Sequence, residues 1–384
     1  MRLVGATLYA VRIPFVEAFS HSAAERRCTD SLVVRVRDET GVEGFGEGAP
    51  RAYVTGETTE SALAHVAGWL WPWVAERPLP EVGDWSALGP APLRALSGLV
   101  PDIPLAGTVA AHAAMSALEL AILDCALRRA GRSIAAVLPP RRRRVTYSGV
   151  ITAGPLEAVV RHARRMRVVG FRHVKLKVGF DDDVARVRAA REALGPEVSL
   201  RLDANGAWTF ARAVEVLTAV EPFDVAAVEQ PLARGAIGEL ARLRGATPVP
   251  LMADESLVTE ADAEALLAEK AVDFFNVRVS KCGGLARSLA LAARAAEAGV
   301  GVQIGSQVGE TAILSAAGRH LAAALPAVTF VEGSFGTLLL SEDVSAESVR
   351  FGHGGEAAPL TGPGLGVTVL EERLRRHAIV VREA

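Results

Sequence analysis

The sequence is poor in cysteine and contains only Cys28, Cys125 and Cys282 among its 384 residues. These three are spaced too widely for a disulfide framework or a zinc site. The formal net charge is only −2, which gives no sign of a nucleic-acid or membrane-surface partner. The sequence also has no apolar run of membrane-spanning length and no apolar signal-peptide core at its start. We therefore expect a soluble protein of the reducing cytoplasm.

Hydrophobic residues, by contrast, make up 50% of the chain, enough for a large core. The length favours one large domain and a smaller one. Residues 1–140 begin with antiparallel strand patterns, and we expect an N-terminal α+β domain there. Residues 141–340 alternate strand and helix patterns, and a proline- and arginine-rich run at 139–144 marks the boundary. Residues 341–384 lose this rhythm, so we expect them to return to the N-terminal domain.

Eight strand patterns occupy the second domain, and several end in a charged residue. We expect strands at 145–150, 171–179, 199–206, 225–231, 249–256, 274–284, 301–305 and 328–333. The charged strand ends recur at intervals of about 25 residues, which is the length of one β/α unit. Neighbouring parallel strands end at the same edge, where (β/α)₈ barrels place their active sites. The pattern therefore predicts a barrel whose charged strand ends converge.

Three carboxylates, Asp203, Glu229 and Asp254, follow successive strands. One interpretation is that each caps the helix that comes after it. The other is that they converge, in which case their repulsion would be relieved by a divalent cation. Oxygen ligands with room for water and substrate favour Mg²⁺, and Mn²⁺ would also fit. We predict a metal site.

Lys175 and Lys177 alternate along one strand, so their side chains share a face. They could be surface lysines whose stems lie along apolar residues. Val174, Leu176 and Val178 supply the outward apolar face, however, which leaves the lysines toward the barrel mouth. A lysine beside a cation and a second lysine loses proton affinity and can act as a base.

Four motifs resemble the muconate-lactonizing-enzyme-like subgroup of the enolase superfamily, the mandelate racemase/muconate lactonizing enzyme family. They are Lys175-Leu-Lys177, Asp203-Ala-Asn205, Val228-Glu-Gln-Pro231 and Ala253-Asp-Glu-Ser256. The stretches 44–48 and 53–57 resemble the N-terminal domain of that family, and 362–366 resembles its C-terminal stretch. The resemblance therefore extends over the whole chain.

The resemblance implies a modified (β/α)₇β TIM barrel under an α+β capping domain built from the N-terminal part and the C-terminal tail. Loops at 19–27 and 51–57 would close over the site. Asp203, Glu229 and Asp254 would hold Mg²⁺, which would bind the carboxylate of a small substrate. Lys177 would remove the α-proton, and Lys175 would help to neutralise the metal-stabilised enolate. The resemblance also implies a homo-oligomer, a dimer or an octamer.

The sequence departs from the family at Arg278, where the subgroup usually has a second lysine. Arginine stays protonated, so it can stabilise negative charge but accepts a proton poorly. Lys281 matches a further family lysine, and its odd spacing puts it on the opposite strand face from Arg278 unless the strand has ended. We therefore expect a one-base enzyme that depends on Lys177. The catalytic candidates are Lys175, Lys177, Arg278 and Lys281.

The last strand lacks the Asp-x-Asp pattern by which dipeptide epimerases of this subgroup hold an ammonium group. Residues 335–340 are closer to the muconate cycloisomerases. Those enzymes have a glutamate at the end of this strand, however, and Gly333 occupies that position here. Glu310 could contact the substrate or cap the following helix. Asp124 and Cys125 look like packing positions. The candidates for substrate contact are Phe19, His21, Tyr53, Asn205, Glu310 and Glu332.

These features together indicate an enzyme that removes a proton α to a carboxylate, with muconate-type cycloisomerisation or a related syn-elimination as the outcome. Within the subgroup, an amino-acid or dipeptide racemase or epimerase and an o-succinylbenzoate synthase-like dehydratase are the alternatives. Outside it stand a Schiff-base lyase that uses Lys177 and a non-catalytic binding protein.

Overall fold

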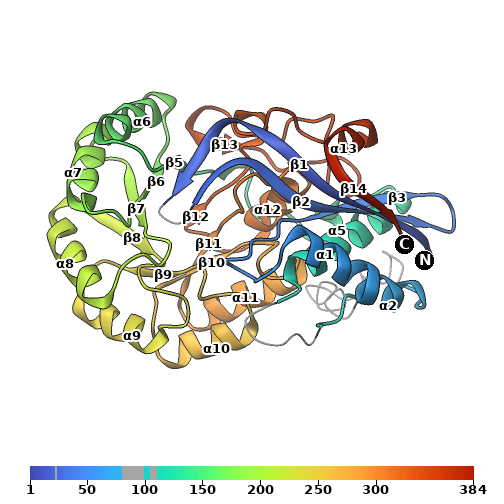
Figure 1. The fold of residues 1–384 in the computed structure, drawn as a ribbon, viewed down its shortest axis with the longest axis horizontal. Coiled ribbons are helices and arrows are strands. Elements are labelled where there is room, and N and C mark those ends of the chain that lie inside the picture. The colour runs from blue at the N-terminus through green and yellow to red at the C-terminus, as the bar shows by residue number, and fades with distance from the viewer. Residues whose placement is uncertain (22–23, 80–98, 104–109) are drawn as a thin grey trace.

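The computed structural model describes residues 1–21, 24–79, 99–103 and 110–384, without the side chains of residues 20, 21, 24 and 25. Figure 1 shows a parallel sheet surrounded by helices and, beside it, an antiparallel sheet at which both ends of the chain lie. The α/β architecture is therefore a curled eight-stranded parallel sheet together with a separate antiparallel-sheet N-terminal domain. This confirms the predicted fold class at that level of detail.

The antiparallel sheet has the strand order β14-β1-β2-β3. Its strands are β1 (Leu3–His21), β2 (Ala24–Asp38), β3 (Glu43–Gly48) and β14 (Ala378–Glu383). The short helices beside it are α1 (Thr59–His65), α2 (Trp71–Ala75) and α13 (Glu371–His377). Strand β14 pairs with β1, so the last residues of the chain extend the sheet that the first residues begin.

The β1–β2 hairpin extends further than predicted, because the expected loop at 19–27 is largely paired strand. A bulge before Phe19 shifts the register, after which Phe19 pairs with Arg26. Backbone hydrogen bonding thus continues into a stretch that its polar composition marked as a loop. The hairpin reaches toward the parallel sheet (Figure 1), where the backbone N–H of Val16 donates to the Leu339 carbonyl at 2.8 Å.

Strand β3 packs directly on the long helix α5 (His112–Arg129). Gly44, Gly46 and Gly48 all face this helix, and a Cβ atom at Gly46 would lie 2.0 Å from the carbonyl oxygen of Ala117. Only glycine allows the two backbones to approach this closely. The β3 residues between these glycines face the other way, because successive side chains of a strand alternate.

The parallel sheet contains the predicted eight strands, in the order β12-β11-β10-β9-β8-β7-β6-β5. They are β5 (Gly149–Ile151), β6 (His173–Lys177), β7 (Ser199–Asp203), β8 (Val225–Glu229), β9 (Leu251–Ala253), β10 (Phe274–Val277), β11 (Gly301–Ile304) and β12 (Phe330–Val331). Each strand before β12 is followed by a helix, and these helices line the outside of the sheet (Figure 1).

The helices of this part are α6 (Leu156–Val169), α7 (Asp183–Leu194), α8 (Phe210–Val220), α9 (Ile237–Ala246), α10 (Glu260–Ala268), α11 (Leu285–Glu297) and α12 (Ala312–Ala324). Thr209, Thr259 and Thr311 cap α8, α10 and α12 with their side chains. No helix in the described ranges combines the length and the hydrophobicity needed to span a bilayer.

The first predicted strand, 145–150, is divided in two. Strand β4 (Val145–Thr146) pairs antiparallel with β13 (Glu356–Ala357), whereas β5 joins the parallel sheet. The chain changes partners between these two strands, where Ser148 N donates to the Val331 carbonyl at 2.8 Å. That hydrogen bond links the residue before β5 to β12, and these are the two edge strands of the curled sheet.

The contact between β3 and α5 should be sensitive to one methyl group. Gly46→Ala would place Cβ against the α5 backbone, and overpacking of this kind costs about 1–3 kcal/mol or more. Gly238→Ala is the matched control, because its Cβ would meet no atom within 4 Å inside α9. Chemical denaturation should show a lower midpoint for Gly46→Ala only. Equal midpoints for the two variants would contradict this account of the packing.

Candidate active site

The carboxyl ends of the central strands bring the predicted charged residues to one edge. Lys177 on β6 is the register partner of Asp203 on β7, and Asp203 is the partner of Glu229 on β8. Asp254 follows β9, and Arg278 follows β10. All five side chains are buried. The convergence predicted from the spacing of the strands is therefore present.

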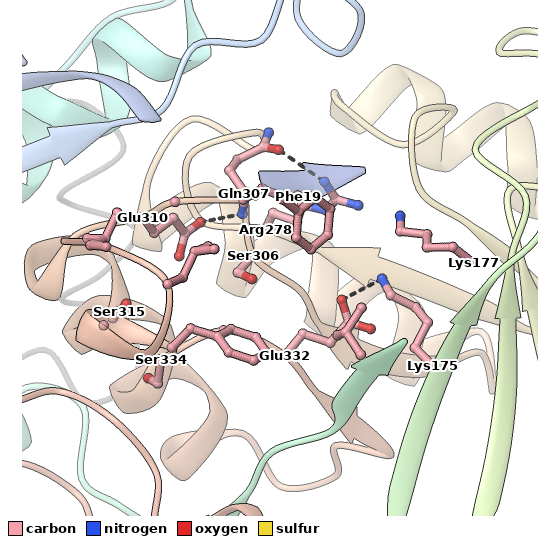
Figure 2. Close-up of a pocket in the computed structure, with 18 of the residues that line it drawn as sticks. Phe19, Lys175, Lys177, Arg278, Ser306, Gln307, Glu310, Ser315, Glu332 and Ser334 are labelled. Atoms are coloured by element: carbon pink, nitrogen blue, oxygen red, sulfur yellow. Dashed lines mark hydrogen bonds and ion pairs between the residues drawn. The ribbon is translucent and has the colours of Figure 1, made fainter. Parts of the chain in front are cut away.

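The two lysines point inward from β6, as Figure 2 shows. Lys177 Nζ donates to Asp203 Oδ2 at 2.7 Å and to Asn205 Oδ1 at 2.8 Å. Lys175 Nζ lies 2.6 Å from Glu332 Oε2 and 3.1 Å from Asp203 Oδ2. Because both lysines are about 95% buried, the alternative of two surface lysines is wrong.

Arg278 and Lys281 both contact Asp254. The Arg278 guanidinium forms an ion pair with Asp254 and donates to Gln307 Oε1 at 3.0 Å. Lys281 Nζ donates to Asp254 Oδ1 at 2.9 Å and to the Asn276 carbonyl at 2.7 Å. Strand β10 has ended before Arg278, so strand alternation does not separate the two cations. Lys281 is fully buried and does not line the pocket.

Burial and mutual charge set the protonation of this cluster. Burial opposes the charge of Lys175, but Glu229, Glu332 and Asp203 outweigh it and raise the pKa of the lysine above its usual range. Despite burial, Lys177 and Lys175 hold the pKa of Asp203 below its usual range. Burial and the charge of Asp203 raise the pKa of Glu229 to about 8. Lys175 therefore stays cationic at neutral pH.

The donor set of Asp203, Glu229 and Asp254 fits a hard divalent cation. All three supply carboxylate oxygens, which are the ligands that hard divalent cations prefer. In addition to burial, the negative charges of Asp203 and Asp254 both raise the pKa of Glu229, which shows that the three carboxylates act on one another. Within the described part of the chain, no three acidic, histidine or cysteine side chains surround a common point as metal ligands do. Asp203 and Asp254 instead pair with Lys177 and Arg278. The three carboxylates match the cation in chemistry, while their present partners are cationic side chains.

A pocket lies beside this cluster, with about 710 Å³ of empty space when its open mouth is included. In Figure 2, Lys175 and Lys177 lie at one end, and Glu310, Ser315 and Ser334 lie at the other. The predicted substrate contacts that line it are Phe19, Tyr53, Asn205, Glu310 and Glu332. The side chain of His21 lies outside the described residues.

Glu310 does not cap the following helix, because Thr311 does. The side chain of Glu310 instead closes the turn before α12, accepting from Gln307 N at 2.6 Å. Burial, reinforced by the charge of Glu47, raises the pKa of Glu310 to about 8. Glu310 is therefore mostly protonated at neutral pH.

Several polar residues of the site were missed. Arg201 is fully buried and donates to Glu332 Oε1 at 3.1 Å. Asn276 Nδ2 and Gln303 Nε2 donate to Glu229 at 2.9 and 3.0 Å. Arg201 precedes Asp203 by two positions on β7, so the alternation that identified the lysine pair would also have found it.

A parallel sheet with carboxylates and lysines at its carboxyl edge is the framework of an α/β enzyme. Residues 158–373, more than half of the chain, match the family described as enolase C-terminal domain-like. The protein belongs to this family and is an enzyme of the enolase superfamily. The resemblance inferred from the motifs is thereby confirmed.

Relatives of two kinds cover nearly the whole chain. Muconate cycloisomerase 1 of Rhodococcus opacus is 31% identical over 365 residues, covering 92% of each chain. The hydrophobic dipeptide epimerase of Enterococcus faecalis is 29% identical over 376 residues, covering 96% of this chain and 100% of its own. The dipeptide epimerase of Cytophaga hutchinsonii, solved with Mg and D-Ala-L-Val, has a TM-score of 0.84 at 25% identity, with 100% and 99% coverage. Both kinds of relative are isomerases.

The raised pKa of Glu310 predicts a pH-dependent affinity. The carboxyl group is neutral at pH 7 and becomes negative as the pH rises through about 8, where it would repel an anionic ligand. The dissociation constant of a short dicarboxylate probe such as succinate, measured by calorimetry, should therefore increase between pH 7 and 9. Glu310→Gln should remove most of this increase. The same increase in the variant would assign the pH dependence to another group.

Proposed function

We propose that the protein removes the α-proton of a small carboxylate substrate with Lys177 as its single base, and that the outcome is muconate-type cycloisomerisation or a related syn-elimination. The observation that carries this proposal is the chemistry of the cations that line the pocket. Lys177 lies at the end of β6, whereas Arg278 follows β10, with β7, β8 and β9 between them in the curled sheet. An arginine on the far side can stabilise an enolate but cannot readily accept a proton.

Within this proposal, Asp203, Glu229 and Asp254 are the residues that would hold Mg²⁺. When bound, the ion would supply electrostatic stabilisation of a carboxylate substrate and of its enediolate form. The finer fold assignment, a (β/α)₇β barrel under a capping domain with limits near residues 140 and 340, belongs to the same proposal. The structure describes a single chain, so the homo-oligomer stays a prediction.

The remaining roles follow from the contacts of each side chain. Asn205 Oδ1 accepts from Lys177 Nζ at 2.8 Å and would orient the amine toward the pocket. Lys175, whose surrounding carboxylates keep it protonated, would stabilise negative charge. Arg278 would do the same from the other side, held by Asp254 and Gln307. Only Lys177 is then left to take and return a proton.

The epimerase alternative is favoured by the relatives that carry that name. Inversion of a stereocentre ordinarily requires an acid/base group on each face of the enolate, and Arg278 does not meet this requirement. A Schiff-base lyase that uses Lys177 needs no metal, so it would leave the cluster of Asp203, Glu229 and Asp254 without a role.

Substitutions of the two cations should separate their roles. Lys177→Ala should abolish α-proton exchange with D₂O, because no other base would remain. Arg278→Met should retain exchange but slow turnover by about 2–4 kcal/mol of transition-state stabilisation, comparable to the loss of one oxyanion donor. Arg278→Lys should add exchange from the second face. Steady-state kinetics and proton NMR measure these effects, and undiminished exchange in Lys177→Ala would contradict the assignment.

The proposed metal site predicts a common effect of three variants. Asp203→Asn, Glu229→Gln and Asp254→Asn should each weaken Mg²⁺ binding in a calorimetric titration and abolish turnover, with circular dichroism unchanged. Asp181→Asn is the control, because Asp181 is exposed on the loop before α7. Wild-type activity in thoroughly chelated buffer would contradict the metal assignment.

A further inference from the structure

We propose that Glu119 and Glu47, to which the mechanism above assigns no role, are positioning residues that hold the two loops bearing Arg278 and Gln307. The proposal deepens the proposed function and rests on it for its kinetic consequence. Each carboxylate extends from the antiparallel-sheet domain to the start of a helix of the other domain. Neither residue lines the pocket.

Glu119 on α5 supplies the cap that α11 lacks. The N-cap position of α11 is Gly284, which has no side chain to accept a hydrogen bond. Glu119 Oε2 accepts from Leu285 N at 2.7 Å, and Oε1 accepts from Ala286 N at 3.0 Å. A Cβ atom on Gly284 would lie 1.5 Å from Glu119 Oε2, so the glycine leaves the space that the carboxylate occupies. Two of the first backbone donors of α11 therefore depend on another domain.

The same domain holds the loop before α11 at two further points. Ala49 N, just after β3, donates to Ser280 Oγ at 2.8 Å. His112 Nδ1, at the start of α5, lies 2.7 Å from the Lys281 carbonyl oxygen. This loop begins at Arg278 and ends at Gly284, so its position determines that of the proposed enolate-stabilising guanidinium.

Glu47 on β3 holds the second loop in the same way. Its Oε2 accepts from Thr311 Oγ1 at 2.6 Å and from Leu314 N at 3.1 Å, while Oε1 accepts from Thr311 N at 3.1 Å. Ser31 Oγ on β2 donates to Oε1 at 2.8 Å. Thr311 and Leu314 belong to the N-terminal turn of α12, which comes immediately after the pocket-lining residues 306–310.

The two loops meet at Arg278, which donates to Gln307 Oε1 at 3.0 Å. A shift of either loop would therefore move the guanidinium or remove its partner. A negative charge at a helix N-terminus is favourable, and an unpaired buried N–H is costly, so each carboxylate should resist such a shift. A misplacement of about 1 Å at a reacting centre can cost about 100-fold in rate.

The experiment compares Glu119→Gln and Glu47→Gln with the control Asp124→Asn. Asp124 is a buried carboxylate on the same helix as Glu119, and it also accepts from two backbone N–H groups, those of Phe45 and Leu365. Neither group belongs to a loop of the site. The glutamine variants should fold, because burial raises the pKa of Glu119 to about 7 and that of Glu47 above its usual range, so the neutral side chains are accessible. Glu119→Asp and Glu47→Asp serve as second variants if either glutamine variant fails to fold.

Hydrogen–deuterium exchange needs no substrate and comes first. Glu119→Gln should speed amide exchange about tenfold in the peptide spanning 278–286, and Glu47→Gln should do so in the peptide spanning 306–314. Asp124→Asn should leave both peptides unchanged. Kinetically, each glutamine variant should lower kcat about 100-fold with little change in KM, whereas the control should stay within a few-fold of wild type.

Unchanged exchange at the two loops, or faster exchange with an unchanged kcat, would overturn the proposal. A loss of kcat in Asp124→Asn equal to that in the glutamine variants would also overturn it, because the effect would then be one of general stability. If the wild type turns over no carboxylate substrate, the proposed function fails instead, and the local exchange pattern still tests whether the two carboxylates hold these loops.

Discussion

The structure of the site depends on pairing buried charges of opposite sign at the carboxyl edge of the parallel sheet. Moving an isolated charge out of water costs several kcal/mol, so each buried ion needs a partner. Asp203 lies between Lys175 and Lys177, and Asp254 lies between Arg278 and Lys281. Removing one member would leave another charge unpaired. An arginine at position 278 satisfies this constraint because it keeps the positive charge beside Asp254. It differs from a lysine there in that it does not readily accept a proton.

The sequence predicted those features that follow from local periodicity. The spacing of β/α units located the strand ends, and alternation along β6 placed the lysine pair inside. The divided strand at 145–150 was missed because β4 and Ser148 have partners far away in the chain, Ala357 and Val331, whereas β5 pairs with the neighbouring β6. Lys281 reaches Asp254 because β10 stops early, and no local pattern indicates where a short strand ends.

The contacts between segments far apart in the chain were also beyond local patterns. Asp124 was interpreted as a packing position, yet its carboxylate accepts from Phe45 N and Leu365 N. Glu47 and Glu119 cap helices that begin more than 150 residues further along the chain. A capping residue is ordinarily sought just before its own helix. When the cap comes from another domain, the only local sign is an N-cap residue that has no capping side chain, such as Gly284.

The central claim is that one face of the enolate has a proton carrier and the other has only a fixed positive charge. The most direct measurement is deuterium incorporation by the wild-type enzyme in D₂O, with the two enantiomers of a chiral carboxylate substrate supplied separately and analysed by chiral separation and mass spectrometry. The account predicts α-deuterium in one enantiomer only, without inversion. Rapid incorporation into both enantiomers, accompanied by racemisation, would contradict it.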